Sequence, residues 1–231
     1  MKDINDICFI IQARLSSERV PRKMIKPFAN TSLVEIACKK INKSKVIPKK
    51  NFFFSAYEDE IKDVVKENGL QIYHRSKESA FSEGPMQQVM EYHDKLDFKY
   101  SVVISACCPL LTVETIDNFA KSYLESPHDG MFSVIAKKNY FWDKDFNMIT
   151  SWPKEADVLN TKLVGVTYEA AHCLYAGRLD TIKDGVWMAK PPFVKNSPTL
   201  FVVPEYETFD IDYNWQFEVA EVLYTNSNIG V

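Results

Sequence analysis

The sequence predicts a single α/β domain over residues 1–231, built on a mainly parallel β-sheet that helices cover on both faces. Short apolar runs alternate with amphipathic stretches from the start, and this strand–helix pair repeats four times in succession. Continuous rather than alternating apolar runs are typical of strands buried on both faces, as in parallel sheets. With 46% hydrophobic and 26% charged residues, 231 residues can form one large core but hardly two full domains.

The first elements follow from local signals. Ile7 to Gln12 (ICFIIQ) is a continuous apolar run and predicts a buried strand. Ser32 begins a helix that runs to Ile41, because Glu35 follows it by three residues as in a capping box. Gly69 ends another helix, since glycine is the usual residue after a helix C-terminus. The predicted elements of this part are a strand at Asn51 to Ser55, a helix at Asp59 to Asn68 and a strand at Leu70 to His74.

The same alternation continues through the middle of the chain. Tyr100 to Ser105 (YSVVIS) predicts a central strand, and a helix begins at Thr112, shortly after Pro109. The further predicted elements are a helix at Met86 to Leu96, the helix at Thr112 to Leu124, core elements at Tyr168 to Tyr175 and Thr199 to Val203, and a last helix at Asn214 to Tyr224.

A polar and aromatic segment, Lys137 to Val164, interrupts this pattern. It has no helical period and no strand pair of its own, and an irregular stretch of this length is usually functional or packs on a partner. We therefore expect an excursion from the domain at residues 137–164.

Several classes of protein are excluded. The first of only seven glycines is Gly69, so neither a G-x-G-x-x-G fingerprint nor a G-x-x-x-x-G-K-[ST] loop exists in the first strand–helix unit. Apolar stretches are far shorter than the ~20 residues that cross a bilayer, and Met1 to Asp6 does not resemble a signal peptide. We expect a cytoplasmic protein with no membrane partner.

Charge is distributed unevenly. Residues 1–50 hold twelve Lys and Arg against four Asp and Glu, whereas the remainder holds sixteen against twenty-seven. A basic segment on an acidic body indicates a pocket for a small polyanion or a nucleic-acid patch, and the pI near 5.9 argues against nucleic acid. The lysine-rich stretch Lys39 to Lys50 is interpreted as the solvated end of a helix and a loop, with nucleic-acid binding a minor alternative.

Cysteine and histidine carry weaker signals. The five cysteines are odd in number and lack paired metal spacing, so reduced and mostly buried thiols are expected. Cys107 or Cys108, at a strand end, remains open as a nucleophile, although no motif places a histidine beside it. The four histidines show no metal spacing and are expected at the surface or in the core.

The loop after the first strand is the first candidate site. It reads Gln12-Ala-Arg-Leu-Ser-Ser-Glu-Arg-Val-Pro-Arg-Lys23, with five bases and one acid between Arg14 and Lys26. Ligands of open α/β sheets bind at the carboxyl ends of the strands, and Arg, Lys, Ser hydroxyl and backbone N–H groups together can hold a triphosphate. The alternative is a solvated basic loop.

The second candidate is Asp210-Ile211-Asp212, between a predicted strand and the last helix. Residues i and i+2 of an extended segment project to one face, so both carboxylates can point at one spot while Ile211 points into the core. Adjacent like charges favour a bound cation, and Mg²⁺ prefers few carboxylates completed by phosphate and water. The alternative is a helix N-terminus decorated with acids for its dipole.

Together these segments resemble a known family. Q-A-R-L-S-S-E-R-V-P-R-K is similar to the P-A-R-x-G-S-K-x-I-P-x-K opening of the CTP-dependent sugar-acid cytidylyltransferases, the acylneuraminate and 3-deoxy-octulosonate cytidylyltransferases. F-D-I-D-Y-N-W-Q-F-E-V-A-E resembles their D-I-D-T-x-x-D-F-x-x-A-E terminus. Weaker likenesses lie between them, in order along the chain, at Phe54 to Ile61, Cys108 to Leu110, Asn160 to Leu163 and Tyr168-Glu169.

The resemblance implies a Rossmann-like nucleotide-binding domain and a set of site residues. Arg14 and Lys23 match bases that hold the CTP phosphates, Arg75 an arginine near the cytosine, and Asp210 with Asp212 the pair that holds Mg²⁺, the implied cofactor. Arg14, Lys23 and Asp212 would be catalytic. The implied nucleotide-binding residues are Ala13, Arg14, Leu15, Ser16, Ser17, Lys23, Arg75, Ala80 and Ser105.

The implied activity is CMP transfer from CTP to the anomeric hydroxyl of a keto sugar acid, releasing pyrophosphate, for surface polysaccharide or glycan biosynthesis. The partners are then CTP and the sugar acid, with a homodimer formed through residues 137–164. Ser16 stands for the family's loop glycine, Glu18 for a basic residue, and the L-Q-P-T-S-P-L-R motif has lost its Gln and Arg at Ser105 and Leu111. These departures keep open another nucleotide, a phosphorylated acceptor, or a non-catalytic nucleotide-binding relative.

Overall fold

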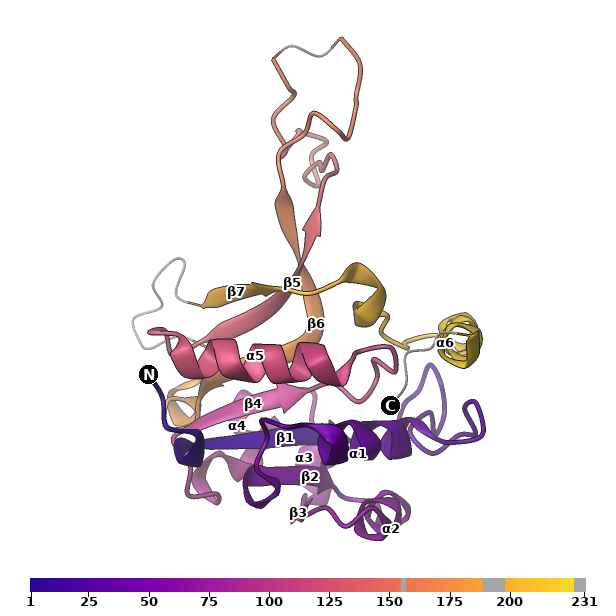
Figure 1. Ribbon diagram of the computed structural model, residues 1–231, viewed down its shortest axis with the longest axis vertical. Helices are drawn as coiled ribbons and strands as arrows, with labels where there is room; N and C mark the ends of the chain where they lie inside the picture. The colour runs from indigo at the N-terminus through magenta and orange to yellow at the C-terminus, as the bar shows by residue number, and fades with distance from the viewer. Residues whose placement is uncertain (155–156, 189–197, 227–231) are drawn as a thin grey trace.

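The computed structural model describes residues 1–154, 157–188 and 198–226. One seven-stranded sheet crosses this described part in the order β3-β2-β1-β4-β6-β5-β7 (Figure 1). The pairs β1–β2, β1–β4, β2–β3 and β5–β7 are parallel, and β4–β6 and β5–β6 are antiparallel. The mainly parallel sheet is confirmed. The strands are β1 Ile7–Ala13, β2 Phe52–Ala56, β3 Ile72–His74, β4 Tyr100–Ile104, β5 Met131–Lys137, β6 Thr167–Arg178 and β7 Thr199–Val202.

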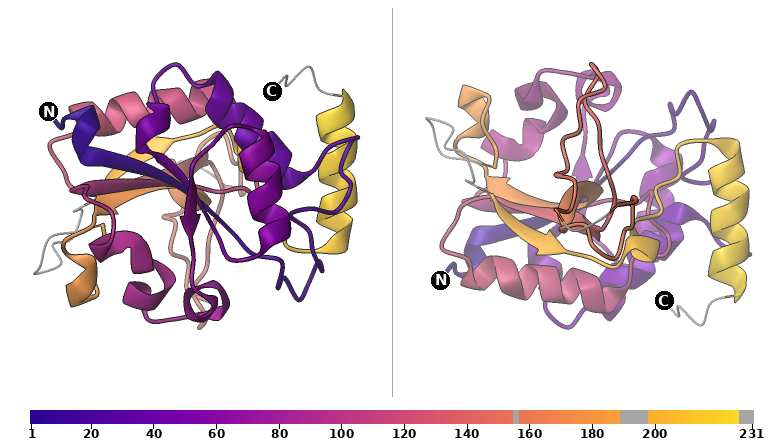
Figure 2. Two further views of the ribbon diagram at one scale, coloured as in Figure 1. Left: turned by 90° about the horizontal axis from the view of Figure 1, so that it is seen from below. Right: turned by 90° about the horizontal axis from the view of Figure 1, so that it is seen from above.

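Helices cover both faces of the sheet, as predicted (Figure 2). Side chains alternate along β1: Ile7, Phe9 and Ile11 enter the larger core, whereas Cys8 and Ile10 enter the smaller core on the opposite face. The larger core receives side chains of α1, α2 and α5, and the smaller one those of α4 and the nearby 3₁₀ turns. The helices are α1 Leu33–Lys43, α2 Asp59–Glu67, α3 Lys77–Phe81, α4 Met86–Val89, α5 Val113–Glu125 and α6 Asn214–Asn226, with 3₁₀ turns η1 Ile4–Asp6, η2 Lys49–Asn51, η3 Glu91–Asp94, η4 Ile182–Asp184 and η5 Glu205–Thr208.

The helix predicted from Met86 to Leu96 is shorter than expected. It stops at Val89 and resumes as the 3₁₀ turn η3. The carbonyl of Val89 accepts hydrogen bonds from Gln12 Nε2 (3.0 Å), Ser79 Oγ (3.1 Å) and Arg75 Nη2 (3.4 Å). Because side chains occupy this acceptor, it does not serve a continuing helix.

Strand β5 is absent from the sequence-based prediction. It pairs with β6 in antiparallel register, with an irregularity between Phe132 and Val134, and both strands continue beyond the body of the domain. Residues 138–154 and 157–166 lie between their ends and project from the sheet, where the excursion is expected (Figure 1). Trp142 and Met148 form an isolated bridge there. Within the described parts of the chain, no helix is long and apolar enough to cross a bilayer.

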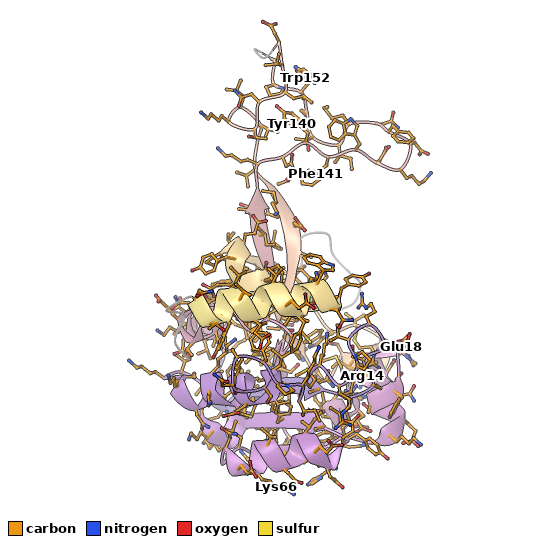
Figure 3. The ribbon with its side chains drawn as sticks, turned by 90° about the vertical axis from the view of Figure 1, so that its right-hand side faces the viewer. Arg14, Glu18, Lys66, Tyr140, Phe141 and Trp152 are labelled. Carbon is orange, nitrogen blue, oxygen red and sulfur yellow. The ribbon has the colours of Figure 1, made fainter. Side chains whose placement is uncertain are left out.

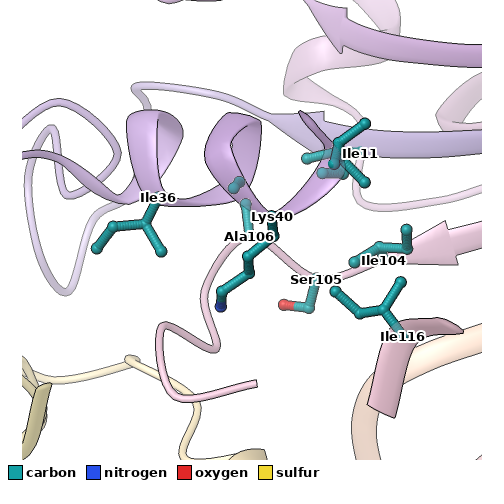
Figure 4. A pocket seen from close by; sticks show the side chains of 9 residues that line it. Ile11, Ile36, Lys40, Ile104, Ser105, Ala106 and Ile116 are labelled. Atoms are coloured by element: carbon teal, nitrogen blue, oxygen red, sulfur yellow. The ribbon is translucent and has the colours of Figure 1, made fainter. Parts of the chain in front are cut away.

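The interpretation of Lys39 to Lys50 as a solvated stretch is wrong for Lys40. Its side chain is buried in α1, and Nζ donates to the carbonyl oxygens of Cys108 (3.0 Å) and Pro109 (2.8 Å). It borders a small cavity of about 10 Å³ together with Ser105 and apolar side chains (Figure 4). A void of this size holds about one water molecule.

Candidate active site

A cavity of about 870 Å³ opens where β1 and β4 end, at the point where the strand order reverses. Ligands of open α/β sheets bind in such crevices. Gln12 and Ala13 lie at the end of β1, and Cys107 follows β4. The residues that line the cavity are Gln12, Ala13, Arg14, Ser16, Ser17, Glu18, Arg19, Lys23, Met24, Arg75, Phe81, Ser82, Glu83, Val89, Cys107 and Asp212.

The loop after β1 is fixed by its own anchors and by the last helix. The Leu15 N–H donates to Glu58 Oε1 at 2.9 Å, and Met24 and Phe28 are buried. The ring of Phe28 packs edge to face against Phe217 of α6, with centroids 5.2 Å apart. Ser16 is outside the set of described residues with positive φ, so the loss of the loop glycine creates no left-handed strain at that position.

Arg14 reaches across the cavity towards α3. Its Nη1 donates to the carbonyl of Ala80 at 3.2 Å, and Nη2 lies 3.8 Å from a carboxylate oxygen of Glu83. Figure 3 shows Arg14 and Glu18 on the body of the domain, well away from Tyr140 and Trp152 of the excursion. The arginine is thus held in the cavity by one carbonyl and a long ion pair.

Arg75 organises the turn beside Arg14. Its Nε donates to Ser79 Oγ at 2.9 Å, and Nη2 donates to the Ser79 carbonyl at 2.8 Å. Burial lowers the pKa of this guanidinium, and the charge of Arg14 lowers it further. Two neighbouring cations in one cavity create a positive potential that an anionic ligand would relieve.

The Asp210-Ile211-Asp212 segment is held through its backbone. Ile211 is fully buried, as predicted, and its N–H donates to the Cys107 carbonyl at 3.1 Å. Lys23 Nζ donates to the carbonyl of Ile211. The Asp212 N–H donates to Gln216 Oε1 of α6 at 2.7 Å. The first loop, the loop after β4 and α6 therefore all fix this segment.

Its two carboxylates have different surroundings. Burial raises the pKa of Asp210, the charge of Lys23 opposes this shift, and the charge of Asp212 adds to it. Within the residues that the structure describes, Asp210 Oδ1 is buried and has no hydrogen-bond partner. Asp212 Oδ1 lies 2.7 Å from Arg19 Nη2 and 3.8 Å from Lys23 Nζ.

These carboxylates fit a hard divalent cation, because a buried oxygen without a partner is costly unless a cation or donor satisfies it. Among the described residues no group of three or more His, Cys, Asp or Glu side chains is placed to hold a metal. Two carboxylates completed by phosphate and water oxygens are the arrangement that Mg²⁺ accepts.

The residues predicted from the sequence divide into two groups. Ala13, Arg14, Ser16, Ser17, Lys23, Arg75 and Asp212 line the one cavity. Leu15, Ala80, Ser105 and Asp210 lie outside its lining. Leu15 packs against the core, Ala80 is buried with its carbonyl on Arg14, and Ser105 borders the small cavity of Lys40.

Sequence reasoning did not select Gln12, Arg19, Phe81 or Cys107 as nucleotide-binding residues. Gln12 and Arg19 belong to the basic loop after the first strand, so the position of that loop could have identified them. No sequence motif pointed to Phe81. Burial raises the pKa of the Cys107 thiol, and the nearby Lys23 partly offsets this. The raised pKa disfavours the thiolate and therefore a nucleophilic role.

An α/β domain with several cations in a cavity at its strand switch point is suited to an anionic ligand such as a nucleotide. The model of the cytidylyltransferase family matches residues 8–181, and the chain belongs to this family. It is therefore a cytidylyltransferase enzyme, and the alternative of a non-catalytic relative is set aside.

Three solved structures share the fold. A CMP:2-keto-3-deoxy-manno-octonic acid synthetase complexed with CTP is 12% identical with a TM-score of 0.66, over 94% of this chain and 97% of that one. A cytidylyltransferase from Leptospira borgpetersenii is 14% identical with a TM-score of 0.63, and the match covers 98% of this chain and 90% of that one. A 4-diphosphocytidyl-2C-methyl-D-erythritol synthase from Anaerococcus prevotii is 14% identical with a TM-score of 0.60, and the match covers 94% of each chain.

Proposed function

We propose that this cytidylyltransferase transfers CMP from CTP to the anomeric hydroxyl of a keto sugar acid and releases pyrophosphate, in a Mg²⁺-dependent reaction of surface polysaccharide or glycan biosynthesis. The observation that carries the proposal is the convergence in one cavity of Arg14 and Lys23, from the start of the chain, with Asp212 from near its end. Such a site can neutralise a triphosphate with Arg14 and Lys23 on one side and with a cation held by Asp212 on the other.

In this reaction the protein acts by positioning and by charge. Arg14 and Lys23 donate hydrogen bonds to phosphate oxygens and stabilise the charge that the leaving pyrophosphate gains. Asp210 and Asp212 would hold Mg²⁺, which supplies charge neutralisation and lowers the pKa of the attacking hydroxyl. Lys23 also holds the carbonyl of Ile211, so one side chain joins the phosphate loop to the two acids.

The experiment mixes the protein with Mg²⁺, CTP and a panel of ulosonic acids and measures pyrophosphate. Lys23→Ala and Asp212→Asn are each expected to lower turnover ~10²-fold or more, as losses of transition-state donors do. Lys66→Ala is the matched control, because Lys66 lies on α2, pairs with Asp63 and is outside the cavity lining. Near wild-type rates in both cavity variants would remove the mechanism.

A second candidate is a cytidylyl or other nucleotidyl transfer to a different acceptor, including a phosphorylated one. The loop after β4 favours it, because Leu111 is fully buried and Ser105 borders the separate cavity of Lys40, so neither contributes a polar side chain to the main cavity. Thermal shifts with each NTP separate the candidates, since a ligand at 100 times its Kd stabilises the fold by about 2.7 kcal/mol. Pyrophosphate release with phosphorylated acceptors and none with ulosonic acids would favour this alternative.

We also propose that the enzyme is a homodimer formed through the excursion. This segment carries large apolar side chains far from the core, including Trp142, Phe146 and Ile149, of which Phe146 is 89% exposed. Exposed apolar surface of this kind marks an interaction site. Light scattering on the purified chain tests the proposal.

A further inference from the structure

Gln12 lies near the end of β1 and lines the main cavity, at the position where the opening motif of the family has proline. Its side-chain Nε2 donates a hydrogen bond to the carbonyl of Val89 at 3.0 Å. The same carbonyl accepts hydrogen bonds from Ser79 Oγ at 3.1 Å and from Arg75 Nη2 at 3.4 Å. The amide of Gln12 is therefore bound to a carbonyl that two further side chains also contact.

This contact fixes which end of the amide faces the cavity. A carbonyl oxygen only accepts hydrogen bonds, so the amide turns its NH₂ group towards Val89 and its oxygen away from it. Among the residues that the structure describes, none donates to Gln12 Oε1, and this oxygen is not one of the buried polar atoms without a partner. Because Gln12 lines the cavity, Oε1 is an acceptor that is open to a ligand there.

The lining around Gln12 suits the base of a nucleotide better than its phosphates. Lys23 lies in the part of the cavity that holds Asp212, with Nζ 3.8 Å from the carboxylate oxygen. Gln12 instead contacts Val89 of α4, and the neighbouring helix α3 ends at Phe81, which is 49% exposed and also lines the cavity. Phosphates favour the cations, whereas a neutral base favours an aromatic face and single polar groups.

We propose that Gln12 selects the base of the nucleotide, with Oε1 accepting a hydrogen bond from the exocyclic amino group of cytosine. Uracil carries an oxygen at that position, so two acceptors would face each other. A free amide could rotate and donate to uracil. Here rotation would turn Oε1 onto the Val89 carbonyl and break the bond that Nε2 makes. The inference rests on the proposed function, because it requires CTP to bind in this cavity.

The test compares CTP with UTP and with the triphosphate of pyrimidin-2-one riboside, an analogue that lacks only the amino group of cytosine. Calorimetry with Mg²⁺ present measures the Kd of each nucleotide for the wild type, for Gln12→Met and for Gln87→Met. Gln87→Met is the matched control, because Gln87 lies on α4, donates from Nε2 to the Lys183 carbonyl at 3.2 Å and is outside the cavity lining.

The wild type and Gln87→Met are expected to bind CTP about tenfold or more tightly than UTP or the analogue, as one base contact gives, whereas Gln12→Met should bind CTP and the analogue within about twofold of each other. A residue that only shapes the cavity would weaken CTP and the analogue by the same factor.

Two results overturn the inference and leave the proposed function standing. One is a wild-type protein that binds CTP and the analogue equally, a comparison that needs no variant. The other is a Gln12→Met protein that keeps the wild-type ratio of the two affinities. A wild-type protein that binds none of the three nucleotides removes the proposed function, and the inference with it.

Discussion

Lys40 carries its amino group into the core, beneath the loop that follows β4. By holding the carbonyls of Cys108 and Pro109, it fixes the loop whose Cys107 carbonyl accepts the N–H of Ile211. A side chain of α1 is therefore connected through one loop to the two acids of the site. Burial lowers the pKa of Lys40 to about 7, and the nearby Cys108 and Glu207 partly offset this.

Lys40→Met is expected to destabilise the fold, because two buried carbonyls lose their donor at a cost of about 1–3 kcal/mol each. The free energy of unfolding that the variant loses should increase with pH. Between about pH 7 and the unfolded-state value near 10.4, the unfolded chain binds more protons at Lys40 than the folded one, so wild-type stability rises with pH relative to the variant. Urea unfolding of both proteins at pH 7 and pH 9.5 measures this difference. A constant difference across that range would show that burial does not shift this amine.

Residue by residue, the sequence contained the cations and acids of the site but not their environment. Arg14, Lys23 and Asp212 were identifiable because family-like motifs surround them, and Ile211 because the alternation of an extended segment places it opposite the acids. The burial of Lys40 could not be foreseen. Lysines are almost never fully buried, and its partners are backbone carbonyls almost seventy positions away, which leave no mark on a side-chain pattern.

Helix α6 is the element that closes the site. One side of it packs on the first loop: Phe217 lies against Phe28, and Glu221 Oε1 accepts the Ala29 N–H at 2.7 Å. The opposite side exposes Trp215, Val219 and Val222. Gln216, near the start of the helix, accepts the backbone N–H groups of Asp212 and Tyr213. The helix therefore positions both the cationic loop and the acids.

Phe217→Ala is expected to lower the free energy of unfolding by about 3–5 kcal/mol, as large-to-small changes of buried aromatic residues do. It should also raise KM for CTP, because the loop loses its contact with α6. Val222→Ala, on the exposed side of the same helix, should change stability by no more than about 0.5 kcal/mol. Urea unfolding and steady-state kinetics on both variants measure these effects, and similar values for the two would contradict the role of α6 in holding the loop.

At the scale of elements, strands and helices with strong local patterns were predictable and those set by distant contacts were not. The strand at Ile7–Ala13 and the helix capped by Ser32 follow from nearby residues. The early end of α4 at Val89 depends on three side chains from elsewhere in the chain. Strand β5 was missed because its pairing with β6 spans the excursion, so no short-range turn marks it.

The whole molecule consists of a compact body that holds the cavity and a projecting excursion that lies apart from it (Figure 1). The exposed apolar residues of the excursion are the basis of the proposed dimer contact. The sequence indicated this division through the loss of periodicity after Lys137, because the segment neither alternates nor repeats with a helical period. It could not indicate that β5 and β6 would form its stem.

Replacing two exposed residues of the excursion, Phe146→Asp with Ile149→Asp, is expected to convert the proposed dimer into monomers, because buried unpaired charge opposes association. Size-exclusion chromatography with light scattering measures the mass. Glu67→Lys, at the end of α2 on the body, serves as control and should leave the mass unchanged. A wild-type chain that is monomeric at all concentrations would remove this proposal.

The ion pair between Arg19 and Asp212 also has a consequence for how the protein is made. The ribosome adds residues in order at ~5–20 per second, so roughly 10–40 seconds separate the synthesis of these two partners. Until the later one emerges, the nascent polypeptide exposes its basic loop without the matching acids. Under the proposed mechanism, fragments terminated before Asp212 are therefore expected to be inert.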